Sequence, residues 1–257
     1  MIAALPMYDL PWLRGPTDRL WHAVRAHLPD AMRDAAPAAP TRDADPWDIW
    51  QSPDLLLAQT CGLPFRARLH ERVALVASPD HRLHDCALGQ YRSTLIRRRD
   101  DTRRLEQLAQ GIMAYNEPLS QSGWAAPMAH LAARGLAPGC LLQTGAHLAS
   151  VDAVAEGRAD FAAIDAVTLA LFAAHDPDTM ARLDPFDHTT PTPALPYITA
   201  ARHDPAPIAT ALAAGIAAIS ADDRAALYLH GVTRLPPSAY TAMPIPDAPD
   251  QAANPSS

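Results

Sequence analysis

Residues suited to anion binding gather in three short polar segments near the middle of the chain. The segments are 120–123 (Ser-Gln-Ser-Gly), 144–150 (Thr-Gly-Ala-His-Leu-Ala-Ser) and 165–168 (Asp-Ala-Val-Thr). Hydroxyls, an imidazole and the backbone N–H groups of a helix start donate hydrogen bonds, and the helix dipole favours negative charge there. The alternative for Ser120 or Ser122 is a plain N-cap, a role in which serine is preferred.

Each polar segment stands between a strand-like run and a helix-like run. In parallel α/β sheets, ligands bind beyond the carboxyl ends of neighbouring strands. We therefore expect the three segments to converge on one site. The apolar pattern predicts strands at 111–115, 141–144 and 160–164, and helices at 120–134, 147–156 and 168–175, the first two ending at Gly135 and Gly157.

The same alternation of strand-like and helix-like runs continues on both sides of the centre. It predicts an α/β protein with mainly parallel sheets. Further strands are expected at 2–7, 54–59, 72–77, 91–97 and 195–199, further helices at 17–28, 207–219 and 221–229, a loop at 31–45, and a loose Pro-rich tail from 236.

Composition excludes several classes of protein. A chain of 257 residues with 49% hydrophobic content can bury one large core or two smaller ones. No apolar run approaches the roughly 18–20 residues of a membrane span. The 28 acidic residues exceed 21 basic ones, all Arg, so a sequence-wide nucleic-acid footprint is excluded. Three cysteines argue against a disulfide scaffold.

The first residues, Met1 to Tyr8, lack the features of a secretory signal: a basic start, a long apolar stretch and a small-residue cleavage site. This favours a cytoplasmic protein, or a periplasmic one if the chain is a mature form or is exported by another route.

Four other groups of residues each allow two interpretations. Segment 81–86 (His-x-x-His-x-Cys) has metal-like spacing, but a solvated loop is favoured because a structural zinc site needs four ligands. Cys61 is a nucleophile or a small buried residue. The arginines of 97–104 are balanced by neighbouring carboxylates, which favours a solvated surface. Trp47 and Trp50 are either ligand-facing aromatics or part of a core.

Segment 116–124 (Asn-Glu-Pro-Leu-Ser-Gln-Ser-Gly-Trp) resembles the N-D-P-x-S-x-S-G-aromatic motif of phosphonate-type solute-binding proteins of ABC transporters. Segments 59–62, 144–150 and 156–165 are similar to further motifs of that family, in the same order. The resemblance implies a type 2 periplasmic-binding-protein fold, which has two α/β lobes and a ligand cleft between them. It also implies closure of the lobes around a hinge when a ligand binds.

The resemblance also assigns the lobes and the site. Lobe one would comprise 1–88 and 189–257, and lobe two 89–188. Gln121 stands where the family often has a second hydroxyl. The ligand-binding residues implied on lobe two are Asn116, Ser120, Gln121, Ser122, Gly123, His147 and Asp165, and those implied on lobe one are Tyr8, Gln59 and Thr60.

Within this set, the resemblance gives each group of residues a role. Ser120, Ser122 and the Gly123 amide would hold phosphonate oxygens, and His147 would match the family's histidine. Asp165 would either face a ligand amine or cap the helix near Thr168.

The expected function is non-catalytic binding of a small anionic or zwitterionic solute, similar to phosphate or phosphonate, as the solute-binding component of an ABC transport system. The alternatives are a cytoplasmic ligand sensor and an enzyme on the same fold that uses Cys61 or His147. We expect no cofactor, no metal, no nucleic acid and no direct membrane insertion. The expected partner is the transporter's membrane component.

Overall fold

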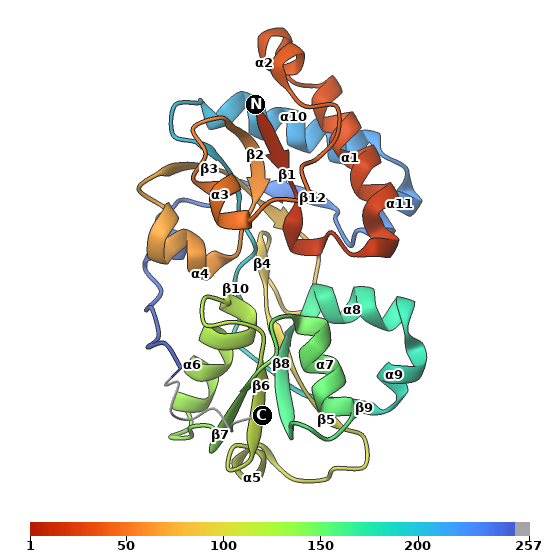
Figure 1. The fold of residues 1–257 in the computed structure, drawn as a ribbon, viewed down its shortest axis with the longest axis vertical. Helices are drawn as coiled ribbons and strands as arrows, with labels where there is room; N and C mark the ends of the chain where they lie inside the picture. Colours follow the sequence, from red (N-terminus) through yellow and green to blue (C-terminus); the bar gives the residue numbers. More distant parts are fainter. Residues whose placement is uncertain (250–257) are drawn as a thin grey trace. The chain divides into compact units, whose positions relative to one another are not determined.

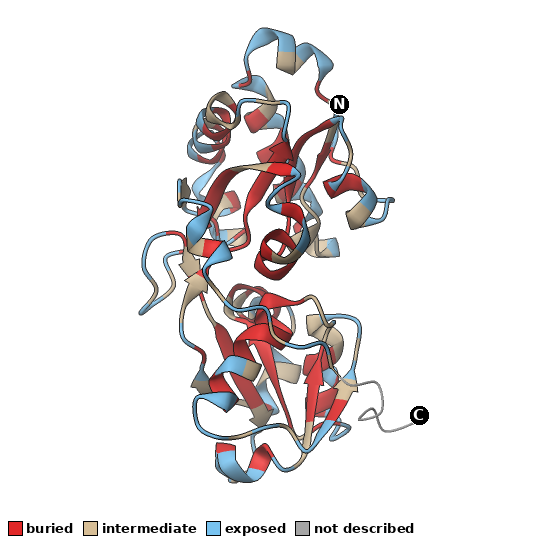
Figure 2. Cartoon of the chain, turned by 90° about the vertical axis from the view of Figure 1, so that its left-hand side faces the viewer, coloured by how far each residue is buried: buried red, intermediate tan, exposed pale blue. Residues whose placement is uncertain are grey.

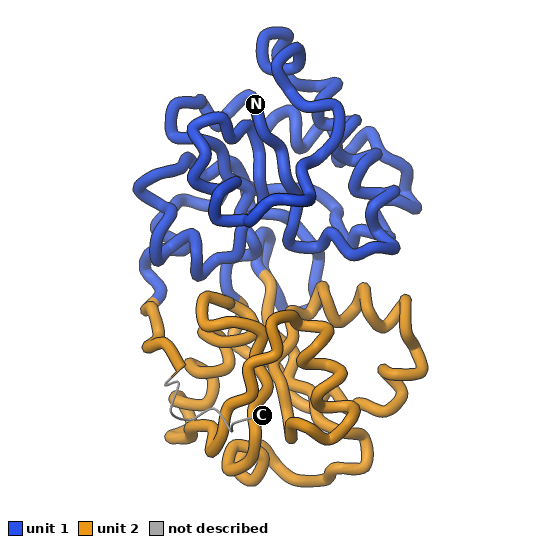
Figure 3. Tube along the Cα trace, in the orientation of Figure 1, with its two compact units in different colours: residues 1–90, 192–243 blue, residues 91–191, 244–257 orange. Residues whose placement is uncertain are grey.

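The computed structural model describes residues 1–249, which form two compact units (Figure 3). Unit 1 comprises 1–90 and 192–243, and unit 2 comprises 91–191 and, within the described chain, 244–249. The lobe division implied by the resemblance puts the whole C-terminal tail, from residue 236, in lobe one. Residues 236–243 do belong to unit 1, but 244–249 belong to unit 2, where the Trp124 indole N–H donates to the Asp247 carbonyl oxygen at 3.0 Å. The rest of the predicted loose tail lies outside the described residues.

The sheet of unit 1 has the strand order β1-β2-β11-β3-β12 (Figure 1). Only β1 and β2 pair in parallel, and β11 is antiparallel to both of its neighbours. Every residue of β2 is buried, as the apolar run at residues 55–58 indicates. Figure 2 shows many of the buried residues in the strands. The strands are β1 (Ile2–Ala4), β2 (Leu55–Gln59), β3 (Val73–Asp80), β11 (Tyr197–Ala200) and β12 (Gly231–Thr233).

Helices flank this sheet, and two of them differ from expectation. The first helix begins at Arg14, three residues before the expected start at residue 17. The predicted loop at 31–45 contains most of a short helix. The helices of unit 1 are α1 (Arg14–Ala26), α2 (Asp30–Ala35), α3 (Pro46–Trp50), α4 (Gly62–Pro64) continuing as a π-helical turn (Phe65–Leu69), α10 (Pro205–Ala218), α11 (Ala221–Ala226) and α12 (Ser238–Thr241).

Helices α1 and α10 pack closely at Gly215, and this contact yields a stability prediction. A Cβ at Gly215 would lie 2.6 Å from Val24 Cγ2 and 2.7 Å from the Val24 backbone nitrogen. Overpacking of this kind typically costs 1–3 kcal/mol and outweighs the gain of up to about 1 kcal/mol in helix propensity. We expect Gly215→Ala to lower the free energy of unfolding by about 1–2 kcal/mol, measured by urea denaturation.

Gly15 in α1 is the matched control for this variant. A Cβ there would meet only the flexible end of Arg19, at 3.4 Å. We expect Gly15→Ala to stabilise the protein slightly. Equal effects of the two substitutions would show that α1 and α10 are not in close contact at Gly215.

The sheet of unit 2 has the strand order β7-β6-β8-β5-β9. Strands β7, β6 and β8 are parallel, whereas β5 is antiparallel to both β8 and β9. The strands are β5 (Ser93–Arg98), β6 (Ile112–Tyr115), β7 (Cys140–Gln143), β8 (Phe161–Asp165) and β9 (Leu183–His188).

The expectation of mainly parallel sheets is therefore wrong, because both sheets are mixed. In each unit a reversed strand is inserted between two strands of a common direction: β11 between β2 and β3 in unit 1, and β5 between β8 and β9 in unit 2. In unit 1 the edge strand β12 is reversed as well, since it is antiparallel to β3. Strands β11 and β5 are each the first strand of their sheet after the chain enters the unit, at residue 192 or 91. Neither follows the helical crossover that makes successive strands parallel.

The remaining elements of unit 2 are helices and connecting segments. A π-helical turn, Gln121–Ala125, leads directly into α6. The short strands β4 (Gln90–Tyr91) and β10 (Thr192–Pro193) pair with each other. Within residues 1–249, no helix is both long and apolar enough to cross a membrane. The helices are α5 (Leu105–Leu108), α6 (Ala126–Ala132), α7 (His147–Ala155), α8 (Ala166–His175) and α9 (Pro177–Ala181).

Candidate anion site

The three polar segments meet at one edge of the sheet of unit 2. They follow β6, β7 and β8, which run in the same direction, and Tyr115 at the end of β6 is in register with Gln143 at the end of β7. Because carboxyl ends of parallel strands share an edge, the helix starts at Gln121, His147 and Ala166 share it too.

Ser120 caps the π-helical turn at this edge. Its backbone is extended, and its Oγ accepts a hydrogen bond from the Gly123 N–H at 2.9 Å. Ser120 therefore acts as the N-cap considered above, and the Gly123 N–H is used in that hydrogen bond. Gln121, Ser122 and Gly123 follow it and are buried.

Ser122 and His147 form the central contact of the site. Ser122 Oγ lies 2.8 Å from His147 Nε2, and Ser93 Oγ donates to the Ser122 carbonyl oxygen at 2.9 Å. The residue His147 is half-buried, but its Nδ1 is buried and has no hydrogen-bond partner in the described chain. Burial lowers the His147 pKa to about 4, so the imidazole is neutral at pH 7.

Gly123 allows the turn to approach its neighbours closely. A Cβ at this position would lie 2.0 Å from Asn116 Oδ1 and 3.2 Å from His147 Cε1. Asn116 Oδ1 is itself buried, and the structure gives it no hydrogen-bond partner within residues 1–249. The predicted residues Asn116, Ser122, Gly123 and His147 are therefore brought together.

Asp165 caps α8. It is 2% exposed, and its Oδ1 accepts from the N–H groups of Val167 at 2.7 Å and Thr168 at 3.2 Å. In the sheet it is in register with Ser93 on β5. Of the two roles considered for Asp165, the structure shows the cap; contact with a ligand amine remains a prediction.

The predicted residues of unit 1 lie around the end of β2. Gln59 Nε2 donates to the Leu195 carbonyl oxygen at 3.2 Å, and Gln59 and Tyr8 line a small pocket. Thr60 is fully buried, and its Oγ1 has no hydrogen-bond partner among residues 1–249. The Tyr8 ring meets the edge of the His81 ring, with centroids 5.7 Å apart.

Sequence reasoning missed His81 as a pocket residue. The sequence pattern considers His81 only as a metal ligand with His84, but His81 is buried whereas His84 is exposed and pairs with Asp85 at 2.8 Å. No three His, Cys, Asp or Glu residues within 1–249 gather to hold a metal ion. His81 directly follows the end of β3. A position after a strand end is the same criterion that points to the three polar segments of unit 2, and it could have pointed to His81 as well.

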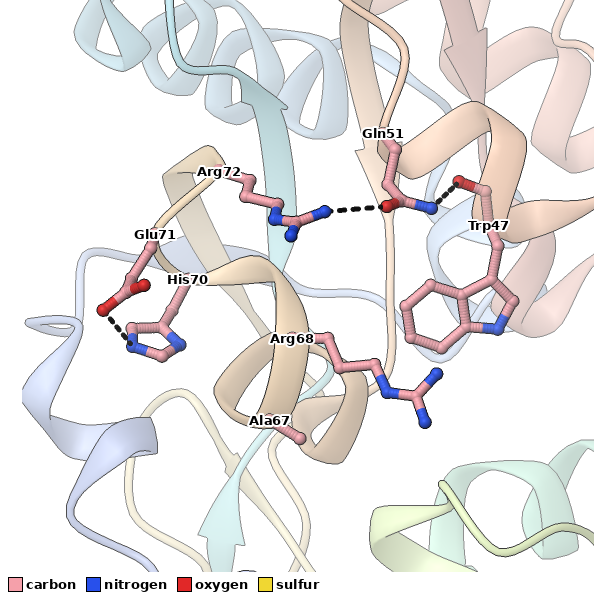
Figure 4. A pocket seen from close by; sticks show the side chains of 7 residues that line it. All are labelled: Trp47, Gln51, Ala67, Arg68, His70, Glu71 and Arg72. Carbon is pink, nitrogen blue, oxygen red and sulfur yellow. Dashed lines mark hydrogen bonds and ion pairs between the residues drawn. The ribbon is translucent and has the colours of Figure 1, made fainter.

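A larger hollow of unit 1, about 560 Å³, lies near α3 (Figure 4). The Arg68 guanidinium lies 5.3 Å from the Trp47 ring centroid, and Arg72 donates to Gln51 Oε1 at 3.2 Å. Trp50 beside it is buried and donates to the Gln59 carbonyl oxygen. The tryptophan pair therefore belongs to the core and its surface rather than to the anion site.

Solved structures that are similar to this chain define its fold. PhnD1 from Prochlorococcus marinus in complex with methylphosphonate has a TM-score of 0.68 at 13% identity, with 94% of each chain covered. XAC2383 from Xanthomonas citri bound to ATP has a TM-score of 0.67 at 16% identity, covering 93% of this chain and 92% of that one. The GluR0 ligand-binding core from Nostoc punctiforme in complex with glutamate has a TM-score of 0.52 at 14% identity, covering 82% and 91%. The chain has the type 2 periplasmic-binding-protein fold, as expected.

Within this class, the sequence identifies the family. Residues 57–240 match the family described as "ABC transporter, phosphonate, periplasmic substrate-binding protein", and the chain belongs to it. None of the curated proteins matches the sequence significantly. The expected function, solute binding within an ABC transport system, is confirmed by this membership.

Proposed function

We propose that the protein binds a phosphate- or phosphonate-like oxyanion, without catalysis, at the Ser122–His147 edge of unit 2. The contact between Ser122 Oγ and His147 Nε2 carries the proposal. It joins two helix starts, where backbone N–H groups lack partners within the helix and attract negative charge.

The neutral imidazole determines what the serine hydroxyl can do. If His147 Nε2–H donates to Ser122 Oγ, the single hydroxyl proton of Ser122 remains for the anion. The packing of Gly123 against Asn116 and His147 holds this arrangement in place. Fixed neutral donors recognise an oxyanion by hydrogen bonds, with no cationic side chain required.

The other predicted contacts complete the proposal. Tyr8, Gln59 and Thr60 are the proposed ligand contacts on unit 1, and Gln121 is an additional amide donor on unit 2. Asp165 would meet an amino group if the solute carries one. The proposed partner of the protein is the membrane component of an ABC transporter. The proposed location of the protein is the periplasm, where the family acts.

Hydrolysis by Ser122 is the competing function that the structure raises, because a serine and a histidine lie within hydrogen-bond reach. Two observations favour binding instead. His147 Nδ1 has no hydrogen-bond partner in the described chain, whereas a catalytic histidine is oriented by a third group. A pKa of about 4 also makes His147 a weak base at neutral pH.

Calorimetry with the wild-type protein tests the proposed ligand class. We expect methylphosphonate or phosphate to bind, and acetate at equal concentration to bind at least tenfold more weakly. At a hundredfold excess over its Kd, a true ligand should stabilise the protein by about 2.7 kcal/mol. Equal binding of all anions, or of none, would contradict the proposal. Covalent labelling of Ser122 by a fluorophosphonate would instead favour the enzyme.

Two variants of His147 locate the binding. Glutamine places an N–H donor near the position of Nε2, whereas asparagine is too short to reach Ser122. We expect His147→Gln to keep affinity for methylphosphonate within about threefold, and His147→Asn to lose about tenfold, the value of one hydrogen bond at about 1.4 kcal/mol. Identical affinities in the two variants would remove His147 from the site.

A further inference from the structure

The anion-binding turn of unit 2, Gln121–Ala125, is a single π-helical turn. The Ala125 N–H donates to the Ser120 carbonyl oxygen at 3.0 Å, which closes a wider ring than an α-helical hydrogen bond does. Turns of this kind are rare and are found mostly at functional sites. Because the wide turn is less favourable than an α-helical one, contacts from outside the turn contribute to holding its shape.

Trp124 connects this turn to its surroundings. It is 3% exposed and lies two residues after Ser122 in the sequence. Its ring packs against the Tyr115 ring at the end of β6, with centroids 5.1 Å apart. Its indole N–H donates to the Asp247 carbonyl oxygen at 3.0 Å. A buried indole N–H needs an acceptor, and here the acceptor comes from segment 244–249 at the far end of the described chain.

Segment 244–249 (Pro-Ile-Pro-Asp-Ala-Pro) turns its prolines toward Trp124 and α6. All three prolines line a hollow of about 460 Å³ together with Trp124 and Met128. Ile245 does not line it and is 57% exposed. A Pro-x-x-Pro spacing beside an aromatic groove is typical of the recognition of proline-rich segments. The prolines therefore determine how this segment docks, and its largest apolar side chain does not.

The docking of segment 244–249 is easily reversed and costs little entropy. Proline has no N–H, so half of the six residues cannot donate a backbone hydrogen bond. The segment also leaves the hollow beside Trp124 unfilled. Proline fixes φ in the free segment as well, so less conformational freedom is lost when the segment docks. The docked fraction therefore depends on the prolines.

We propose that segment 244–249 positions the anion-binding turn through Trp124, so that release of the segment weakens anion binding although the segment is not part of the anion site. This inference rests on the proposed function, since it takes the anion to bind at Ser122. The apparent affinity is proportional to the fraction of molecules whose site is in the binding geometry. Docking of the segment raises that fraction and thereby regulates the site from within unit 2.

A double-mutant cycle tests whether the segment acts through Trp124. Trp124→Phe keeps an aromatic ring beside Tyr115 but deletes the indole N–H. Pro246→Gly keeps the Asp247 carbonyl but restores backbone freedom to the segment. We expect each variant to bind methylphosphonate about fivefold more weakly in calorimetry. Because both changes break one link, the double variant should also lose about fivefold, whereas independent effects would multiply to about twenty-fivefold.

The control variant is Ile245→Ala, and a spectroscopic readout accompanies it. This substitution changes the same segment at its exposed side chain and should leave the affinity unchanged. The indole ¹⁵N–H signal of Trp124 is identified by its absence in Trp124→Phe. Before any ligand is added, this signal should move in Pro246→Gly and stay in place in Ile245→Ala. Methylphosphonate should move it in the wild-type protein.

The outcomes separate the inference from the proposed function. If Pro246→Gly leaves the affinity for methylphosphonate unchanged, or leaves the Trp124 signal in place, the segment does not position the turn. Additive losses in the double variant would show that Trp124 and the segment act independently. Each of these results overturns the inference, while the proposed function stands as long as the wild-type protein binds. If the wild-type protein binds neither methylphosphonate nor phosphate, the proposed function is overturned and the inference with it.

Discussion

Replacing Ser122 by aspartate should abolish phosphonate binding, with a loss of at least a hundredfold in affinity. The new carboxylate would stand where Ser122 Oγ now contacts His147 Nε2. Two like charges about 4 Å apart repel by about 4 kcal/mol at the effective dielectric constant near a protein surface. The measurement is calorimetry with methylphosphonate at pH 8, because a buried aspartate beside His147 would raise the pKa of that histidine.

Two further variants keep this prediction decisive. Ser220→Asp adds the same charge at the start of α11 in unit 1, where Ser220 caps the Asp223 N–H and aspartate can also cap. It should not change the affinity. Ser122→Ala adds no charge, and losing its hydroxyl should cost about tenfold. If Ser122→Asp is folded by circular dichroism and binds like the wild type, the anion site lies elsewhere.

Acidification should destabilise the protein between pH 6.5 and pH 4, before most carboxylates titrate. His81 and His147 both have a folded-state pKa lowered to about 4 by burial, against about 6.5 when unfolded. In that window the unfolded chain binds protons that the folded chain does not, so stability is complete above pH 6.5 and falls as pH decreases. For buried His81 the loss by pH 4.5 is roughly 2–3 kcal/mol, and for half-buried His147 it is smaller because solvent screens the charge.

Urea unfolding at pH 7.5 and pH 4.5 measures this loss. His81→Asn and His147→Gln each remove one titrating ring and should reduce the difference between the two pH values. Asp101, Asp160 and Asp223 have lowered pKa values and act only below about pH 4. Glu117, whose pKa is raised by burial, opposes the trend. A double variant as acid-sensitive as the wild type would rule out His81 and His147 as the cause.

The local pattern of apolar and polar residues was sufficient to predict the strands and helices that carry the anion site. The run 111–115 forms β6 at 112–115, and the helix expected at 147–156 spans 147–155. These segments have continuous apolar residues or a clear helical start, so local preference and tertiary packing agree. The convergence of three strand ends followed from the topology rule alone.

The features that were missed depend on distant parts of the chain. Strand β9 (LDPFDH) is polar and contains proline, and it is a strand because β5 supplies its hydrogen bonds. The direction of β5 and β11 depends on where the chain enters each unit. His81 stands in a loop-like polar sequence, and its orientation comes from a carbonyl 147 residues further along.

The central position of β11 has a consequence for the order in which the molecule is made. Strands β2 and β3 join one sheet only through β11, which lies between them. A ribosome synthesises β11 after the whole of segment 91–191, so the sheet of unit 1 stays open while that intervening segment emerges. The five strands of unit 2 are complete at residue 188, before β11 begins at residue 197. Synthesis therefore begins with unit 1, but the sheet of unit 1 is completed after that of unit 2. Until β11 is made, β2 and β3 each have an unpaired edge, and these edges need shielding from other chains.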